Sequence, residues 1–158
     1  MRVVLASLLT VLFLAATAAA QKSPEGVWRL TEVTATGADG GTRQATQPSL
    51  YLFTKKHYSI TYVAGDKART VADASTLSAD ELRSTFVDSF IANAGSYEYK
   101  GGKLTIHPIV AKSPGYMKDG TWTTYLVKMD GGTMTITSES TNSGPSANPT
   151  TFKLIRVE

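Results

Sequence analysis

Apolar residues alternate with polar residues through most of the sequence after Gly26, and short glycine turns interrupt the alternation. A period of two places successive side chains on opposite faces of a β-strand, so these runs predict strands with one covered face. The pair Gly101-Gly102 separates two such runs, and both central residues of the favoured hairpin turn need a positive φ, which glycine adopts readily. The sequence therefore predicts an antiparallel all-β fold.

Eight runs have this strand pattern, and hairpin-length turns join several of them. Strands joined in this way pair as antiparallel neighbours, and eight up-and-down strands can close into a barrel with space for one small ligand. An open sandwich of the same strands is the alternative architecture. The predicted strands are 27–33, 50–54, 57–63, 96–100, 103–107, 122–128, 134–137 and 152–157.

One segment between the strands has a helical pattern instead. Ser78 and Glu81 have the spacing of a capping box, in which each side chain accepts a hydrogen bond from the other residue's backbone N–H. Apolar residues then recur at helical spacing at Leu82, Phe86 and Phe90. With Gly95 as the stop, these signals predict an amphipathic helix over residues 79–94, whose apolar face is expected to pack on the domain.

Three other stretches are predicted to be loops. They are rich in glycine, proline, serine, threonine and similar polar residues, which favour turns over regular strands. The predicted loops are 37–48, 113–121 and 140–150.

The first twenty residues have the composition of an export signal. Arg2 precedes an apolar run over residues 3–16, and three alanines stand before Gln21. This run is shorter than the roughly 18 to 20 residues that a membrane-spanning helix needs, so we expect cleavage after Ala20. An uncleaved N-terminal anchor is the alternative. The mature domain, 21–158, is then expected to be secreted or periplasmic and to have no membrane span.

The composition argues against several classes of partner. The chain has no cysteine, so neither disulfides nor thiol chemistry is expected. Its formal net charge is only +3 at pH 7 and its basic residues are scattered, which argues against nucleic acid. The two histidines, His57 and His107, lack the spacing of metal ligands, and no glycine-rich phosphate loop precedes a helix. No metal and no cofactor is therefore predicted.

The two ends of the mature sequence resemble lipocalins. Gly26-Val27-Trp28 resembles the G-x-W signature of the first strand, and Arg156 stands where these proteins place a basic residue over that tryptophan. The order of the motifs between them resembles bacterial and fungal lipocalin-like domain proteins, which are calycin-type β-barrels. These motifs are Tyr51-Leu52-Phe53-Thr54, Tyr58-Ser59, Ala94-Gly95-Ser96-Tyr97, Leu104-Thr105-Ile106-His107-Pro108 and Gly132-Thr133-Met134-Thr135-Ile136. The resemblance implies an eight-stranded barrel in which Gly26, Trp28 and Arg156 have structural roles.

A barrel of this kind implies a binding site in its interior. Aromatic side chains with a few hydroxyls make suitable walls for a small apolar molecule. The residues predicted to line such a cavity are Tyr51, Phe53, Tyr58, Tyr62, Tyr97, Tyr99, His107, Trp122 and Tyr125. The resemblance thus favours a secreted or periplasmic carrier of a small hydrophobic ligand, and a filled barrel without a cavity is the alternative.

Two other functions remain open at this point. The first is an enzyme, a cyclase, isomerase or hydratase, that uses His107 and a pocket tyrosine as acid and base. This hypothesis requires His107 to lie inside the cavity, and no other catalytic residue is predicted. The second is a protein-interaction or inhibitor module, which would use loops 37–48 and 140–150 around a filled core.

Overall fold

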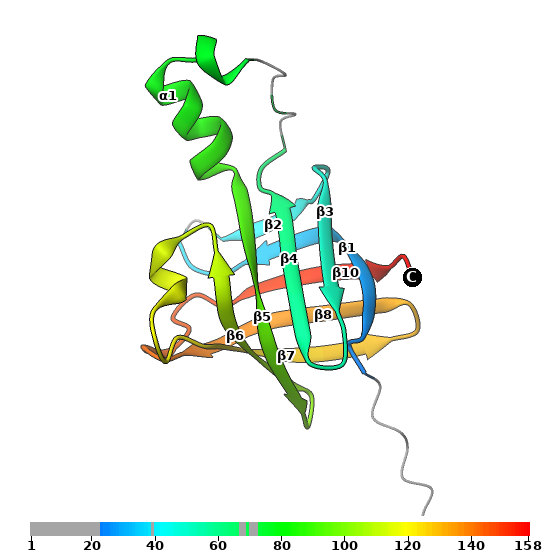
Figure 1. The fold of residues 1–158 in the computed structure, drawn as a ribbon. Coiled ribbons are helices and arrows are strands. Elements are labelled where there is room, and N and C mark those ends of the chain that lie inside the picture. Colours follow the sequence, from blue (N-terminus) through cyan, green and yellow to red (C-terminus); the bar gives the residue numbers. More distant parts are fainter. Residues whose placement is uncertain (1–22, 39, 67–68, 70–72) are drawn as a thin grey trace, which may run out of the picture.

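The strands of this protein close into a barrel, seen in Figure 1. The computed structural model describes residues 23–38, 40–66, 69 and 73–158, so the predicted leader 1–20 lies outside the described residues. Closure follows from the pairing of β10 (Thr150–Arg156) with both β1 (Gly26–Ala35) and β8 (Thr133–Thr141). The predicted antiparallel barrel is confirmed, and the open-sandwich alternative is wrong.

Eight strand positions make up the wall. The central strands are β4 (His57–Val63), β5 (Phe90–Lys100), β6 (Lys103–Ala111) and β7 (Thr123–Asp130). Two short strands, β2 (Gly41–Gln44) and β3 (Ser49–Phe53), pair with successive parts of β1 and together form one interrupted strand. β9 (Gly144–Pro145) only extends the edge of β8.

Two predicted loops therefore contain strand structure. Residues 37–48 include β2, and residues 140–150 include the end of β8, the whole of β9 and the start of β10. Their polar composition concealed this, because β1 and β8 extend beyond the apolar runs and supply backbone partners to polar residues.

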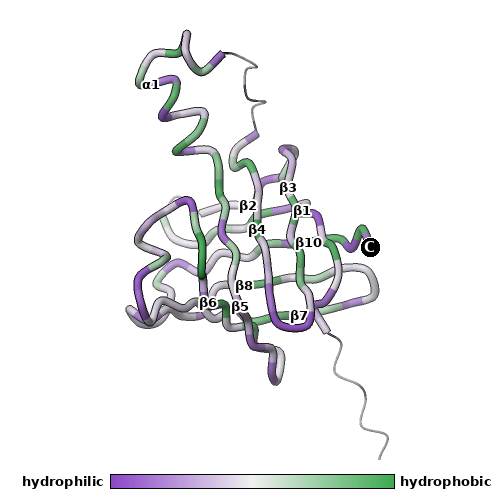
Figure 2. The backbone as a smooth tube through the Cα atoms, viewed as in Figure 1, coloured by the Kyte–Doolittle hydropathy of each residue, from purple (hydrophilic) through white to green (hydrophobic). Residues whose placement is uncertain are grey.

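The connections differ between the two ends of the barrel. At one end, which we call the closed end, residues 54–56, 101–102 and 131–132 make short turns. Gly101 and Gly102 have φ values of 60° and 76°, as the hairpin prediction requires. At the other end, which we call the open end, the connections 64–89, 112–122 and 142–149 are long. Hydrophilic residues mark the turn between β3 and β4 in Figure 2.

Short helices occupy the long connections of the open end. They are η1 (Ala74–Thr76), α1 (Ala79–Leu82), η2 (Arg83–Asp88) and η3 (Pro114–Met117). Within the described ranges, no helix has both the length and the apolar character of a transmembrane span.

The helix predicted over 79–94 starts where expected, but in the structure it ends earlier than predicted. The capping box is present, because Ser78 Oγ accepts from the Glu81 N–H and the Glu81 carboxylate accepts from the Ser78 N–H. Helical backbone ends at Asp88, and β5 begins at Phe90 and pairs with β4. Pairing with a neighbouring strand outweighs local helical spacing for these residues.

Two further expectations about this segment are wrong. The apolar face of the helix does not pack closely on the barrel, since Phe86 and Val87 are 46% and 53% exposed and the helix stands beyond the rim in Figure 1. Gly95 does not stop a helix. It lies inside β5, where a Cβ atom would be 2.0 Å from the His107 carbonyl oxygen.

A tryptophan seals the closed end. Trp28 is fully buried, and its Nε1 donates to the Pro24 carbonyl at 2.8 Å. The guanidinium carbon of Arg156 lies 4.1 Å from the centre of the indole ring, and Nη1 donates to the Glu25 carbonyl at 2.7 Å. Gly26 has a φ of 129°, and a Cβ there would lie 2.1 Å from the same Nη1, so a side chain has no room.

The interior nearer the closed end is filled with apolar side chains. They come from the inner positions of nearly every wall strand and bury each other from water. This core includes Leu30, Phe53, Leu104, Ile106, Val127, Met134, Ile136 and Leu154. Any site inside the barrel must therefore lie in its open half.

Candidate functional site

Strand register decides which side chains face the interior. Residues directly opposite each other in antiparallel strands share a face. Starting from the buried Trp28, the successive opposite residues in β3, β4 and β5 are Tyr51, Ile60 and Asn93. All of these positions therefore face inward, and alternation assigns the rest of each strand.

Five tyrosines gather inside the barrel, from the apolar core, which includes Tyr51 and Tyr58, to the open end. The rings of Tyr51 and Tyr62 are stacked with centroids 6.0 Å apart, and Tyr62 meets Phe152 edge-on at 6.4 Å. Burial raises the pKa of Tyr125, and three neighbouring hydroxyls raise it further, those of Tyr116, Tyr62 and Tyr58. We define the tyrosine cluster as Tyr51, Tyr58, Tyr62, Tyr116 and Tyr125.

The phenols of Tyr51, Tyr58, Tyr62 and Tyr125 are neutral at physiological pH. Burial is the largest cause of a raised pKa at Tyr51, Tyr58 and Tyr62, because a phenolate loses its hydration inside the barrel. A neutral phenol donates one hydrogen bond and accepts others. The cluster therefore supplies hydrogen-bonding groups rather than strong bases.

Two polar atoms in the interior have no hydrogen-bond partner among the described residues. They are the hydroxyl oxygen of Tyr58, a residue only 3% exposed, and Oδ1 of Asn93. Tyr58 lies opposite Gly95 and Asn93 lies opposite Ile60, so the two side chains enter the barrel from neighbouring strands at diagonal positions. Leaving such a group unpaired costs about 1–3 kcal/mol, so both atoms are suited to bind a polar group of a guest or a water.

A pocket lies beside Asn93 at the open end. It encloses about 80 Å³, which is small beside the roughly 300–1,000 Å³ of sites for drug-sized ligands. Its walls come from β5, β6 and the η3 connection and consist of Ile91, Ala92, Asn93, Ala111, Lys112, Ser113 and Tyr116. Tyr116 also borders a more open hollow of about 320 Å³ together with Trp122. The η3 turn therefore separates two hollows.

Arg43 occupies an inner register position of β2, and its side chain is exposed. It lies opposite the buried Val33, and Val33 lies opposite Phe152, which contacts Tyr62. Burial raises the pKa of Tyr62, and the nearby positive charge of Arg43 partly offsets that effect. The guanidinium therefore lies at the edge of the tyrosine cluster, on the rim of the barrel.

The structure brings only some of the predicted cavity residues together. Tyr51, Tyr58, Tyr62 and Tyr125 belong to the tyrosine cluster. Phe53 and Tyr97 meet edge-on at 5.5 Å nearer the closed end, where the Tyr97 hydroxyl donates to the Thr54 carbonyl at 2.6 Å. Tyr99 packs against the apolar core. These last three residues lie nearest the short turns of the closed end, at 54–56 and 101–102.

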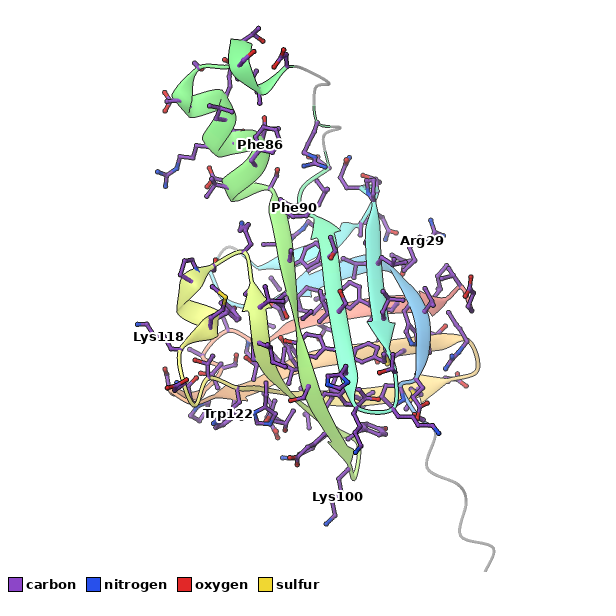
Figure 3. All side chains as sticks on the ribbon, viewed as in Figure 1. Arg29, Phe86, Phe90, Lys100, Lys118 and Trp122 are labelled. Carbon is purple, nitrogen blue, oxygen red and sulfur yellow. The ribbon has the colours of Figure 1, made fainter. Side chains whose placement is uncertain are left out.

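His107 and Trp122 do not belong to the interior. His107 lies opposite Ser96 and follows the inward-facing Ile106, so it occupies the outer face of β6. Trp122 precedes β7 and borders the hollow beside η3, and Figure 3 shows it at the edge of the barrel. The enzyme hypothesis requires His107 to act as a base inside the cavity, and the structure places this residue outside it. Among the described residues, no group of three or more His, Asp or Glu side chains is placed to hold a metal ion.

Sequence reasoning missed three residues of the candidate site. Asn93 lies in the part of β5 that was predicted to be helical, and Arg43 and Tyr116 lie in predicted loops. In a strand, Arg43 shares a face with Gly41 and Ala45, because residues two apart point the same way. Glycine and alanine give only a weak apolar signal, so the sequence did not mark this face as an inner one.

Comparison with known proteins adds a likeness to a solved structure. No protein-family model matches the sequence, and no curated protein sequence matches it significantly. The crystal structure of a lipocalin-like protein from Bacteroides uniformis ATCC 8492 shares 16% identity over 84% of this chain and 96% of that one, with a TM-score of 0.45. The register itself, with eight up-and-down strands closed on themselves and Arg156 stacked over Trp28, makes this chain a lipocalin-like β-barrel in fold.

Proposed function

We propose that this protein is an exported binding protein that holds a small, largely apolar ligand in the open half of its barrel. The observation that carries the proposal is the pair of buried polar atoms without partners, Tyr58 Oη and Asn93 Oδ1. A protein rarely retains such atoms in an interior unless water or a guest satisfies them.

The surroundings of these atoms support a guest that is mainly apolar. Rings of the tyrosine cluster, with Phe152 and Ile91, form the wall on the inner faces of their strands. Such a wall contributes contact area, while a few hydroxyls and an amide fix the orientation of the ligand. A small apolar molecule with one or two polar groups fits this chemistry best.

A neutral fluorescent probe tests the proposal directly. N-phenyl-1-naphthylamine, which fluoresces strongly only in apolar surroundings, is titrated into the protein comprising residues 21–158. We expect saturable binding at one site, which Tyr125→Ala weakens at least tenfold because it removes a wall of the cavity. Leu126→Ala, on the outer face of the same strand and 43% exposed, is the control and is expected to leave binding unchanged.

Two outcomes of this titration would contradict the proposal. Unsaturable fluorescence, or equal effects of the inner and outer substitutions, would show that the probe binds only the surface. Native mass spectrometry of protein secreted by its own host gives a second measurement, in which a co-purifying small molecule is expected. N-terminal sequencing of that material tests export, since cleavage after Ala20 leaves Gln21 as the first residue.

A further inference from the structure

We infer that the ligand carries an anionic oxygen group, such as a carboxylate or sulfonate, and that Arg43 binds this group at the rim of the barrel. This inference rests on the proposed binding function and specifies the chemical class of the ligand. The apolar part of the ligand would then lie among the rings of the tyrosine cluster.

The first argument is the direction in which Arg43 faces. Along β2, Gln44 points outward and donates to the Glu32 carboxylate at 3.1 Å, while Ala45 packs against the core. Arg43 precedes the outward-pointing Gln44, lies two residues before Ala45 and is opposite the buried Val33, so it occupies an inner register position. Its side chain is exposed, so the guanidinium lies at the rim of the barrel, within reach of a ligand that enters from the open end.

The second argument is that Arg43 has no partner of opposite charge among the residues that the structure describes. The ion pairs within the described part of the chain join Arg83 to Asp88 and Lys103 to Glu139. Arg156, the other inward-facing arginine, is packed on Trp28 and bonded to backbone carbonyls. No Asp or Glu occupies an inner position of the described wall strands, so the protein itself provides no counter-ion there.

The third argument is the character of the neighbouring groups. Arg43 lies close enough to Tyr62 for its charge to act on the hydroxyl, and that phenol is neutral and donates a hydrogen bond. A guanidinium and phenolic O–H groups are all donors, and together they complement an acceptor with negative charge. A cationic ligand would meet only repulsion from Arg43 and would find no carboxylate in the wall.

A matched pair of probes tests the inference. The anion 8-anilinonaphthalene-1-sulfonate has the same anilinonaphthalene frame as the neutral N-phenyl-1-naphthylamine and differs by its sulfonate. We expect Arg43→Gln to weaken binding of the anionic probe about tenfold or more, the loss typical of one charged hydrogen-bonded contact, and to change binding of the neutral probe less than about twofold. Added salt should weaken binding of the anionic probe to the wild-type protein and have a smaller effect on its binding to Arg43→Gln.

Two further variants complete the experiment. Arg29→Gln removes a charge from the outer face of β1 and is expected to change neither affinity. Arg43→Lys keeps the charge and should retain most of the affinity for the anion. If Arg43→Gln leaves the anionic probe unaffected while the neutral probe still binds, the inference fails and the binding function stands. If neither probe binds the wild-type protein, the binding function itself fails.

Discussion

The hydroxyl of Tyr58 destabilises the folded protein, because it is buried without a hydrogen-bond partner among the described residues. The hydroxyl of Tyr97, by contrast, donates to the Thr54 carbonyl at 2.6 Å. Both residues face inward and belong to neighbouring strands. Their comparison separates a hydroxyl that stabilises the fold from one that is available to a ligand.

Removing each hydroxyl should therefore have opposite effects on stability. We expect Tyr58→Phe to raise the free energy of unfolding by about 0.5–1.5 kcal/mol, because it deletes an unpaired buried group, and Tyr97→Phe to lower it by about the same amount. Chemical denaturation followed by circular dichroism measures both. A loss of stability in Tyr58→Phe equal to that in Tyr97→Phe would show that the Tyr58 hydroxyl is satisfied, for example by a bound water.

At the scale of elements, β5 and β6 approach each other closely at a bulge. The register shifts between Ala94 and Gly95, where Pro108 and Val110 are the successive partners. The Gly95 position has no space for a side chain, since the nearest obstacle is backbone that cannot rotate away. Ile109 is the extra residue of this bulge, and Asn93, two residues before Gly95, lines the neighbouring pocket.

A methyl group at this position tests that interpretation. Gly95→Ala should destabilise the protein by more than about 2 kcal/mol, because strand backbones must separate to accept it. Gly115→Ala is the matched control, since nothing lies within 4 Å of its added Cβ and its φ is not positive. It should change stability by less than about 0.5 kcal/mol in the same denaturation experiment. Equal effects of the two substitutions would contradict the close approach.

The helical segment 79–88 is held differently from the wall strands. Its capping box joins Ser78 to Glu81, and the Lys112 ammonium group donates to the Val87 carbonyl, but its residues are not buried in the core. Few buried contacts allow local opening that leaves the barrel intact.

Loss of the cap should affect this segment alone. Ser78→Ala removes an N-cap worth about 0.5–2 kcal/mol, so amide exchange in residues 79–88 should quicken while the melting temperature changes little. Ser84→Ala, an exposed position inside the helix, should not quicken exchange. A fall in the melting temperature of Ser78→Ala by more than a few degrees would show that the segment stabilises the whole barrel.

For the whole molecule, the tyrosine cluster makes stability depend on alkaline pH. Burial raises the pKa of Tyr51, Tyr58, Tyr62 and Tyr125 above the value of about 10 in the unfolded chain, so the folded state holds these protons longer. The contribution is fully present below pH 10 and is lost as the pH rises further. We expect the free energy of unfolding to fall between pH 10 and pH 11.5, by up to about 1.4 kcal/mol per pH unit for each phenol. Urea unfolding at pH 8.0, 10.0 and 11.5 measures this, and a flat profile would contradict it.

The architecture could be predicted from the sequence because the residues of the core alternate with polar residues along the strands. Leu30, Leu104 and Ile136 alternate with polar neighbours, and short turns at glycine pairs fix which strands are adjacent. The candidate site could be predicted only in part. Alternation assigned the tyrosines of β3, β4 and β7, but Asn93 had helical neighbours and Tyr116 belongs to no strand, so only the three-dimensional pairing places them together.

The difference between the two ends of the barrel has a consequence for how such a chain can diversify. The short turns and the Trp28–Arg156 stack hold the fold at one pole, while the long connections 73–89 and 112–122 lie at the mouth, the other pole. Insertions or substitutions in 73–89 and 112–122 leave the strand ladders of the barrel untouched. A library randomised only at the mouth should therefore yield proteins of similar robustness that accept different guests.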